Sequence, residues 1–306
     1  MFRKKYKDKI SNFRTWNQLE HCEKYMLFPE NIGENLSIDE VSVSKGELYT
    51  FVTNKAGHGK KNTIVACIEG TKSEDIIKVL QKIHVSKRAK VKEITLDMAN
   101  NMALAAQESF PMAKLVTDRF HVVRLAQNAM QAQRVKQGWL ELDIENEAIS
   151  KAKENKEKYQ SIVLENGETP RQILARSRYV LAKKESQWTE NQKERAKILF
   201  EKYPKIEEVY HHTIQLRACY ESKDKIEAMK NFKYWIDKTH KKDFKEFYTV
   251  ANTVENHFET ILNYFNNKNT NASAESFNSK IKLFRANQRG VIDKRFFLFR
   301  LMKLFA

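Results

Sequence analysis

Cysteine, glycine and proline are scarce in this chain of 306 residues. The 3 cysteines lie far apart with no Cys-x-x-Cys pair, which argues against a disulfide framework and a structural zinc site and indicates a reducing compartment. No run of about 18 or more apolar residues occurs, so we expect no membrane span. The basic N-terminus has no apolar segment behind it and is therefore no secretory signal. With 8 glycines and 4 prolines, the chain has few turn formers, which favours helices.

Positive charge dominates the polar residues. The chain has 55 Lys and Arg against 39 Asp and Glu, which gives a net charge of +16. Such an excess favours a polyanionic partner, although solubility alone is the simpler explanation of a basic composition. The length suffices for one large domain or two modest ones with a real core.

The first half of the chain has the pattern of an α/β protein. Segments 36–43, 47–54 and 61–69 are rich in β-branched and aromatic residues and are separated by glycine-containing turns, which predicts an antiparallel meander. A helix beginning at Ser73, a strand over 91–97, a helix over 100–109, a strand over 114–117 and a helix from Asp118 to about Gln137 follow. This order predicts an RNase H-like core with a mixed five-stranded sheet and flanking helices.

The remaining segments divide the chain into four parts. Residues 1–34 are expected to form a basic leader that is helical around Trp16 to Phe28, and 35–137 to form the first part of the RNase H-like core. Residues 138–265 are helical in pattern and highly charged, so we expect a large all-helical insertion with Trp188 and Trp235 in its core. Residues 266–306 supply the final core helices and a basic C-terminus.

Three carboxylates are the candidate catalytic residues. Asp39 falls in the first strand and Asp97 closes the fourth, and an RNase H-like topology brings these positions side by side. Glu275, on a later helix, can complete the site, because Mg²⁺ prefers oxygen ligands. Two such ions would activate an attacking water or 3′-hydroxyl and stabilise the leaving oxygen of a phosphodiester. The ordinary alternatives are a helix N-cap for Asp97 and a solvated helix face for Glu275.

The spacing around Glu275 favours a functional helix. A stripe of polar side chains lies at offsets 0, 3, 7 and 10 along one side of it, namely Glu275, Asn278, Lys282 and Arg285. Apolar residues suited to core packing lie on a neighbouring face, namely Phe277, Ile281 and Phe284. One helix therefore combines a candidate metal ligand, an amide and two cations that can bind phosphate.

Asp118 and His121 form a second polar cluster at the start of a helix. Their spacing allows both side chains to point to one side, where His121 could orient Asp118 or bind a phosphate. Asp118 also competes with Asp97 for the second catalytic place, and the topology favours Asp97.

Basic residues become dense after Glu275. The candidates for contacts to the DNA backbone are Lys280, Lys282, Arg285, Arg289 and Arg295. Phosphate contacts of this kind supply affinity without sequence readout, whereas a merely solvated charged face is the alternative explanation.

Taken in order, these motifs resemble those of a bacterial insertion-sequence transposase of the DDE class, ISL-three type. The matching segments are Ile38-Asp39-Glu40, Leu96-Asp97-Met98, Asp118-Arg119-Phe120-His121 and Glu275-x-x-Asn278-x-x-Ile281-Lys282. The resemblance covers about residues 36–137 and 268–303, and each motif is weak by itself.

The resemblance implies an RNase H-like catalytic core and a DDE triad of Asp39, Asp97 and Glu275 that holds two Mg²⁺ or Mn²⁺ ions. It implies cleavage and joining of double-stranded DNA at the transposon ends and a target, in a bacterial cytoplasm near the nucleoid. Asp118 and His121 would be the accessory Asp-x-x-His pair. Strand transfer at two ends favours a homodimer.

The chain departs from the family at its N-terminus. Family members usually carry a zinc-binding segment and a helix-turn-helix ahead of the core, and only about 35 residues precede the first strand here. We therefore expect either a separate DNA-recognition chain or a catalytically inactive, domesticated remnant that binds DNA without sequence preference.

Overall fold

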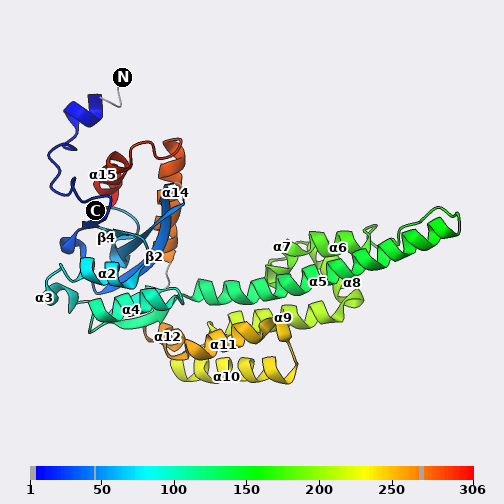
Figure 1. Ribbon diagram of the computed structural model, residues 1–306. Helices are drawn as coiled ribbons and strands as arrows, with labels where there is room; N and C mark the ends of the chain where they lie inside the picture. The colour runs from blue at the N-terminus through cyan, green and yellow to red at the C-terminus, as the bar shows by residue number, and fades with distance from the viewer. Residues whose placement is uncertain (1–4, 45, 269–271) are drawn as a thin grey trace. The chain divides into compact units, whose positions relative to one another are not determined.

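The computed structural model describes residues 5–44, 46–268 and 272–306, with the side chains of 272–275 also left undescribed. The chain divides into two compact units (Figure 1). The core unit comprises the chain through Arg119 together with His257–Ala306, and the helical unit comprises Phe120–Asn256.

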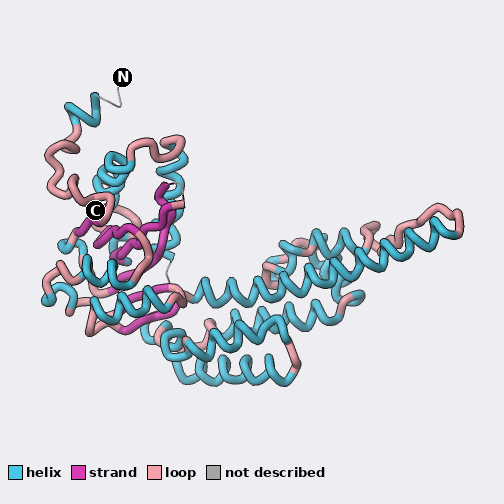
Figure 2. The backbone as a smooth tube through the Cα atoms, viewed as in Figure 1, coloured by secondary structure: helices cyan, strands magenta, loops and turns pink. Residues whose placement is uncertain are grey.

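A six-stranded mixed sheet forms the centre of the core unit (Figure 2). Its strands are β1 (Tyr25–Leu27), β2 (Asn35–Ser44), β3 (Glu47–Asn54), β4 (Ile64–Glu69), β5 (Glu93–Leu96) and β6 (Lys114–Thr117), in the order β1-β4-β3-β2-β5-β6. Strands β2 to β4 form the antiparallel meander, and β5 and β6 run parallel to β2. The five predicted strands and the RNase H-like order are confirmed, and β1 is an additional edge strand.

Helices cover both faces of this sheet. On one face, α2 (Ser73–Leu80) and α4 (Asn100–Ser109) pack on Leu36, Ile38 and Ile94. On the other face, α14 (Ala272–Asn287) and α15 (Lys294–Phe305) pack on Val41 and Phe51. Because side chains alternate along a strand, residues 37, 39, 41 and 43 of β2 share the face covered by α14. The short helices α3 (Val85–Arg88), α12 (Phe258–Leu262) and α13 (Tyr264–Asn267) complete the unit.

The N-terminal segment differs from the expected helix around Trp16 to Phe28. Within residues 5–34 the structure has a helical turn at Tyr6–Ile10, a series of turns, β1, and a 3-10 turn at Pro29–Asn31. Met26 is fully buried and pairs with Cys67 of β4. The difference comes from tertiary structure. Pairing with β4 at the edge of the sheet satisfies the backbone hydrogen bonds of this segment, and this gain outweighs its local preference for a helix.

The helical unit consists of α5 (Arg119–Glu154), α6 (Pro170–Arg176), α7 (Arg178–Leu181), α8 (Glu190–Lys202), α9 (Pro204–Cys219), α10 (Lys225–Lys241) and α11 (Tyr248–Asn256). Helix α5 continues past the expected end near Gln137, since the residues after Gly138 are mostly strong helix formers. This unit runs over 120–256, whereas we expected the insertion over 138–265. None of the helices in the described part of the chain is long and apolar enough to cross a membrane.

The core of the helical unit is aromatic. Trp235 is fully buried, stacks on His212 with ring centroids 4.6 Å apart, and donates its indole N–H to the His212 carbonyl. Burial lowers the pKa of His212 to about 3, so this imidazole is neutral near pH 7. Trp188 is half-buried and donates to the Val180 carbonyl. Both tryptophans therefore serve packing, as expected, and the exposed tryptophan is Trp139 of α5.

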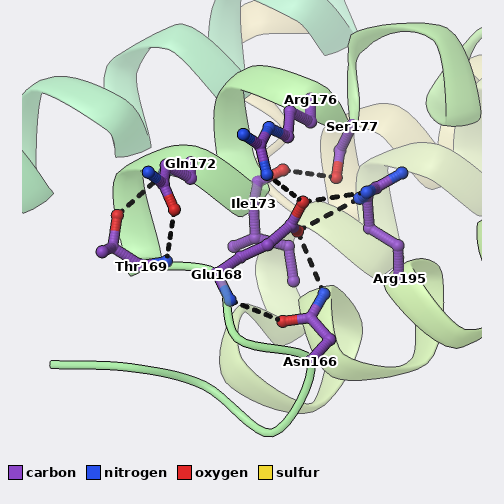
Figure 3. A network of polar contacts seen from close by, with 8 residues as sticks. All are labelled: Asn166, Glu168, Thr169, Gln172, Ile173, Arg176, Ser177 and Arg195. Carbon is purple, nitrogen blue, oxygen red and sulfur yellow. Dashed lines mark hydrogen bonds and ion pairs between the residues drawn. The ribbon is translucent and has the colours of Figure 1, made fainter.

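A buried carboxylate joins three segments of the helical unit (Figure 3). Glu168 is 4% exposed and pairs with Arg176 at 2.9 Å and with Arg195 at 2.8 Å. Asn166 is the third partner and donates to the same carboxylate at 3.0 Å. The hydrogen bond from Arg195 is the main reason why the pKa of Glu168 falls from 4.5 to about 2.

We predict that Glu168→Gln destabilises the helical unit by about 3 kcal/mol near neutral pH, since one pKa unit corresponds to about 1.4 kcal/mol. A lowered pKa in the folded state stabilises the fold above the ordinary value of 4.5, and this stability is lost as the pH falls through about 2. Thermal unfolding followed by circular dichroism between about pH 7 and pH 3 should therefore show a smaller acid-induced loss in the variant than in the wild type. The matched control is Glu190→Gln, which removes an exposed ion pair with Lys193 and should have little effect.

Candidate active site

Two of the predicted carboxylates lie level with each other on adjacent parallel strands. The register pairs Ser37 of β2 with Thr95 of β5, so Asp39 is level with Asp97, the residue just past the end of β5. Side-chain alternation places both on the face covered by α14, because Ile38 and Leu96 pack on the opposite face. Two strands that are far apart in the sequence thus bring the two carboxylates side by side. We call this line of residues, which runs across neighbouring strands at one level of the sheet, the row.

Asp39 is held by a helix from the end of the chain. Its Oδ2 accepts a hydrogen bond from Asn278 Nδ2 of α14 at 2.5 Å, and its Oδ1 accepts the Glu40 N–H at 2.8 Å. Seven residues further along α14, Arg285 donates to the Ser42 carbonyl at 2.9 Å. These two bonds show that α14 runs along β2 in the same direction (Figure 1).

Asp97 is half-buried at the connection between β5 and α4. Its Oδ1 accepts the Ala99 N–H at 2.9 Å, a bond within the turn before α4, and the N-cap of that helix is Ala99 and not Asp97. A carboxylate has two oxygens, and this bond therefore does not use up its capacity to accept other bonds or bind a cation.

Glu275 lies in α14, one turn before Asn278, and its side chain falls outside the described residues. Among the side chains that are described, no group of three or more His, Cys, Asp or Glu residues is arranged to hold a metal ion. The structure brings Asp39 and Asp97 together with the amide of Asn278, and the assignment of Asp39, Asp97 and Glu275 as a catalytic triad remains a prediction.

Negative charge is concentrated around this row. The pKa of Glu40 is raised, first by burial and then by the charges of Asp97 and Asp39. The two aspartate charges disfavour ionisation of Glu40, and a divalent cation bound nearby would relieve that repulsion. The side-chain oxygens of Asp39 and Asp97 are donors of the kind that hard divalent cations prefer.

Asp118 extends the same row beyond Asp97. The pairing of Leu96 with Thr117 makes Asp118 level with Asp97, and Asp118 is buried, at 4% exposure. His121 is half-buried in the first turn of α5 and lies in the helical unit, with its ring 5.7 Å from that of Phe120. The Asp118–His121 pair therefore stays a prediction.

A buried ion pair that was not predicted lies further back along β5, before Asp97. Lys55, just past the end of β3, donates from Nζ to Glu93 Oε1 of β5 at 3.2 Å and to Thr95 Oγ1. Glu93 Oε2 also accepts from Asn267 Nδ2 at 3.1 Å. The sequence contained a signal for this pair. Glu93 and Thr95 alternate with the apolar residues Ile94 and Leu96, and the structure buries all four residues of this strand.

Three of the five predicted DNA-binding residues have partners within the chain. Lys280 donates to the Gly59 carbonyl at 2.6 Å, Arg285 to that of Ser42, and Arg295 pairs with Glu23 at 3.1 Å. Lys282 and Arg289 are exposed.

Two exposed lysines near α14 were not among the predicted DNA-binding residues. Lys60 and Lys61 directly follow Gly59, whose carbonyl accepts the bond from Lys280 of α14. The loop after β3 therefore adds to the basic surface around that helix.

We predict that Asn278→Asp lowers the melting temperature in EDTA by roughly 2–8 °C, because a second carboxylate against Asp39 costs about 1–2 kcal/mol. Ca²⁺ should restore most of this loss, whereas the control Asn278→Ala, which removes the bond without adding charge, should respond to Ca²⁺ like the wild type. Identical melting of the two variants in EDTA and in Ca²⁺ would show that position 278 does not face Asp39.

Comparison with known proteins agrees with this arrangement. Residues 36–301 match the DDE transposase family of the ISL-three type, whose members are described as transposases, and this stretch contains Asp39, Asp97, Asp118 and Glu275. The same comparisons found no significant match among curated proteins or among solved structures. The match spans most of the chain, and the protein therefore belongs to the ISL-three-type family of DDE transposases.

Proposed function

We propose that this chain is the catalytic chain of a DDE transposase that cuts and joins DNA at the ends of an insertion sequence. The observation that carries the proposal is the level placement of Asp39 and Asp97 on β2 and β5, within a chain of this family. Glu275, one turn from the residue that bonds Asp39, would be the third member of the triad.

The carboxylates of Asp39, Asp97 and Glu275 would hold two Mg²⁺ or Mn²⁺ ions. When bound, these ions supply an activated water or 3′-hydroxyl and stabilise the leaving oxygen of the phosphodiester. The chain's own residues keep the site in order. Asn278 holds the Asp39 carboxylate by its bond to Oδ2, and the Ala99 N–H holds that of Asp97. Fixing ligands in this way lowers the cost of assembling the site around a cation.

The expected partner is double-stranded DNA, as the transposase family implies. Lys282 and Arg289 on and after α14, with Lys60 and Lys61 on the neighbouring loop, would bind the phosphate backbone. We further propose a homodimer as the active form, since strand transfer joins two ends.

Single substitutions of the triad test the proposal. Asp39→Asn, Asp97→Asn and Glu275→Gln should each reduce Mn²⁺-dependent nicking of a plasmid carrying the element's ends by on the order of a thousandfold, because several kcal/mol of charge stabilisation are lost. Circular dichroism should show folded variants. The matched control is Glu74→Gln, an exposed carboxylate on α2, which should cut like the wild type.

Two other outcomes have clear meanings. A triad variant that keeps full activity would remove that residue from the metal site. A wild-type chain that binds DNA but never cuts it, in Mg²⁺ or Mn²⁺, would instead identify a remnant that only binds DNA.

Replacing the two exposed cations on and just after α14 tests the DNA surface. Lys282→Ala/Arg289→Ala should weaken binding to duplex DNA and lower the slope of log affinity against log salt by about 2, since each lost phosphate contact removes about 0.9. Fluorescence anisotropy over a salt series measures both quantities. Lys78→Ala, an exposed lysine of α2, is the control, and an unchanged slope in the double variant would place DNA elsewhere.

A further inference from the structure

Exposed apolar side chains gather at one end of the helical unit. The last turns of α5 extend past α6 and α8, and the chain then returns alongside α5, where Ile144, Tyr159 and Ile162 line one pocket (Figure 1). A cluster of exposed apolar residues of this kind marks a contact surface. Six large apolar residues of these two segments are between 42% and 62% exposed, namely Trp139, Leu140, Ile144, Ile149, Ile162 and Val163.

The charges beside these apolar residues indicate which kind of partner they contact. Negative charge is dense here, and a phosphate backbone is repelled by carboxylates. A protein surface that offers apolar side chains and positive charge is attracted instead. The acidic residues of this end of α5 are Glu141, Asp143, Glu145 and Glu147.

The matching positive charge lies on the same helix. Lys151 and Lys153 are the basic residues of the last turn of α5, directly after the acidic residues. Lysines at the end of a helix ordinarily complement its dipole, but acidic residues in the middle of a helix have no such explanation. The end of α5 therefore changes from negative to positive along its length.

One exposed stripe of α5 combines the apolar and the charged residues. Leu140, Ile144, Glu147 and Lys151 lie at offsets 0, 4, 7 and 11, along one side of the helix, and all four are exposed. Glu147 and Lys151 have no ion-pair partner within the described part of the chain. The stripe thus offers two apolar side chains, one negative charge and one positive charge to a partner.

This stripe is complementary to itself in one direction. When two copies of α5 pair antiparallel, with the two-fold axis near residue 149, Glu147 of each copy lies opposite Lys151 of the other. The symmetry makes each contact twice. Parallel pairing would place like charges opposite each other, and repulsion of this kind selects the antiparallel direction.

We propose that two copies of this chain associate through an antiparallel contact between the ends of their α5 helices, with Glu147 paired to Lys151 across the two-fold axis. Ile144 and Leu140 supply the apolar part of the contact. The inference rests on the homodimer proposed above and gives that homodimer an interface. The interface belongs to the helical unit, whereas the candidate metal site belongs to the core unit.

Sedimentation velocity of the full chain over a concentration series tests the interface without relying on activity. Glu147→Lys and Lys151→Glu should each raise the dissociation constant of the dimer by about tenfold or more, because two attractions per dimer become repulsions. An equimolar mixture of the two variants should recover the wild-type constant within about threefold, since opposite charges then meet between copies. A parallel contact would show no weakening by either single variant.

The apolar part of the contact has its own test. Ile144→Ser should raise the dissociation constant of the dimer by about tenfold, because an apolar contact in the interface is lost. The matched control is Ile226→Ser, a similarly exposed isoleucine on α10, and the charge control is Lys230→Glu on the same helix. Both controls should associate like the wild type. Circular dichroism should show that every variant is folded, since all these positions lie on the surface.

Three results overturn the inference. The first is a wild-type chain that stays monomeric at about 100 µM, alone and on duplex DNA, which removes the homodimer as well and leaves the apolar end of α5 to another protein. The second is a dimer that neither charge variant weakens. The third is a pair of charge variants that weaken the dimer but do not restore it when mixed.

The proposed function fails or stands separately. Asp39→Asn should dimerise like the wild type while it fails to cut DNA. A dimer that the charge variants leave intact would therefore overturn only the interface, whereas an Asp39→Asn chain that dimerises and keeps full nicking activity would overturn only the metal site.

Discussion

The parallel pairing of β2 with β5, and of β5 with β6, is the constraint on which the site depends. Its register makes Asp39, Asp97 and Asp118 level, although 79 positions separate the first from the last. A slip of one residue in either pairing would turn a carboxylate into the apolar layer under α2 and α4, where Ile38 and Leu96 are buried. The hydrophobic pattern that determines this register therefore also determines which side chains lie together in the candidate site.

Much of the core unit could be predicted because its signals are local. Strand alternation, glycine at the turns and the apolar spacing of α2 and α4 depend on neighbours in sequence, and these elements have the expected bounds within a few residues. The structure of the N-terminal segment could not be predicted from local signals. Residues Tyr25–Leu27 form a strand only because β4 offers an unpaired edge, which the sequence of the segment does not contain. The uninterrupted length of α5 likewise reflects helix formers that continue beyond the point where amphipathic spacing fades.

The candidate site was predictable to the extent that topology determines it. Asp39 and Asp97 follow from strand order alone, and Asn278 follows from helical spacing. Lys55 does not, since its contacts with Glu93 and Thr95 require the order β3-β2-β5 and a side chain long enough to cross the middle strand. A lysine in a loop that contains several lysines is ordinarily exposed to solvent. Only the three-dimensional arrangement distinguishes Lys55 from the exposed Lys60 and Lys61.

Helix α14 couples packing to chemistry more directly than any strand. Phe277 and Ile281 are fully buried against the sheet, and this packing fixes the rotation of the helix about its axis. With that rotation fixed, Asn278 meets Asp39 and Arg285 meets the carbonyl of Ser42. A turn of about 100°, the step of one residue, would carry the amide away from the carboxylate. The apolar residues of α14 therefore contribute to the site by setting the direction in which the polar side chains of the same helix point. A substitution that repacks Phe277 would disturb the hydrogen bond between Asn278 and Asp39 without changing either residue.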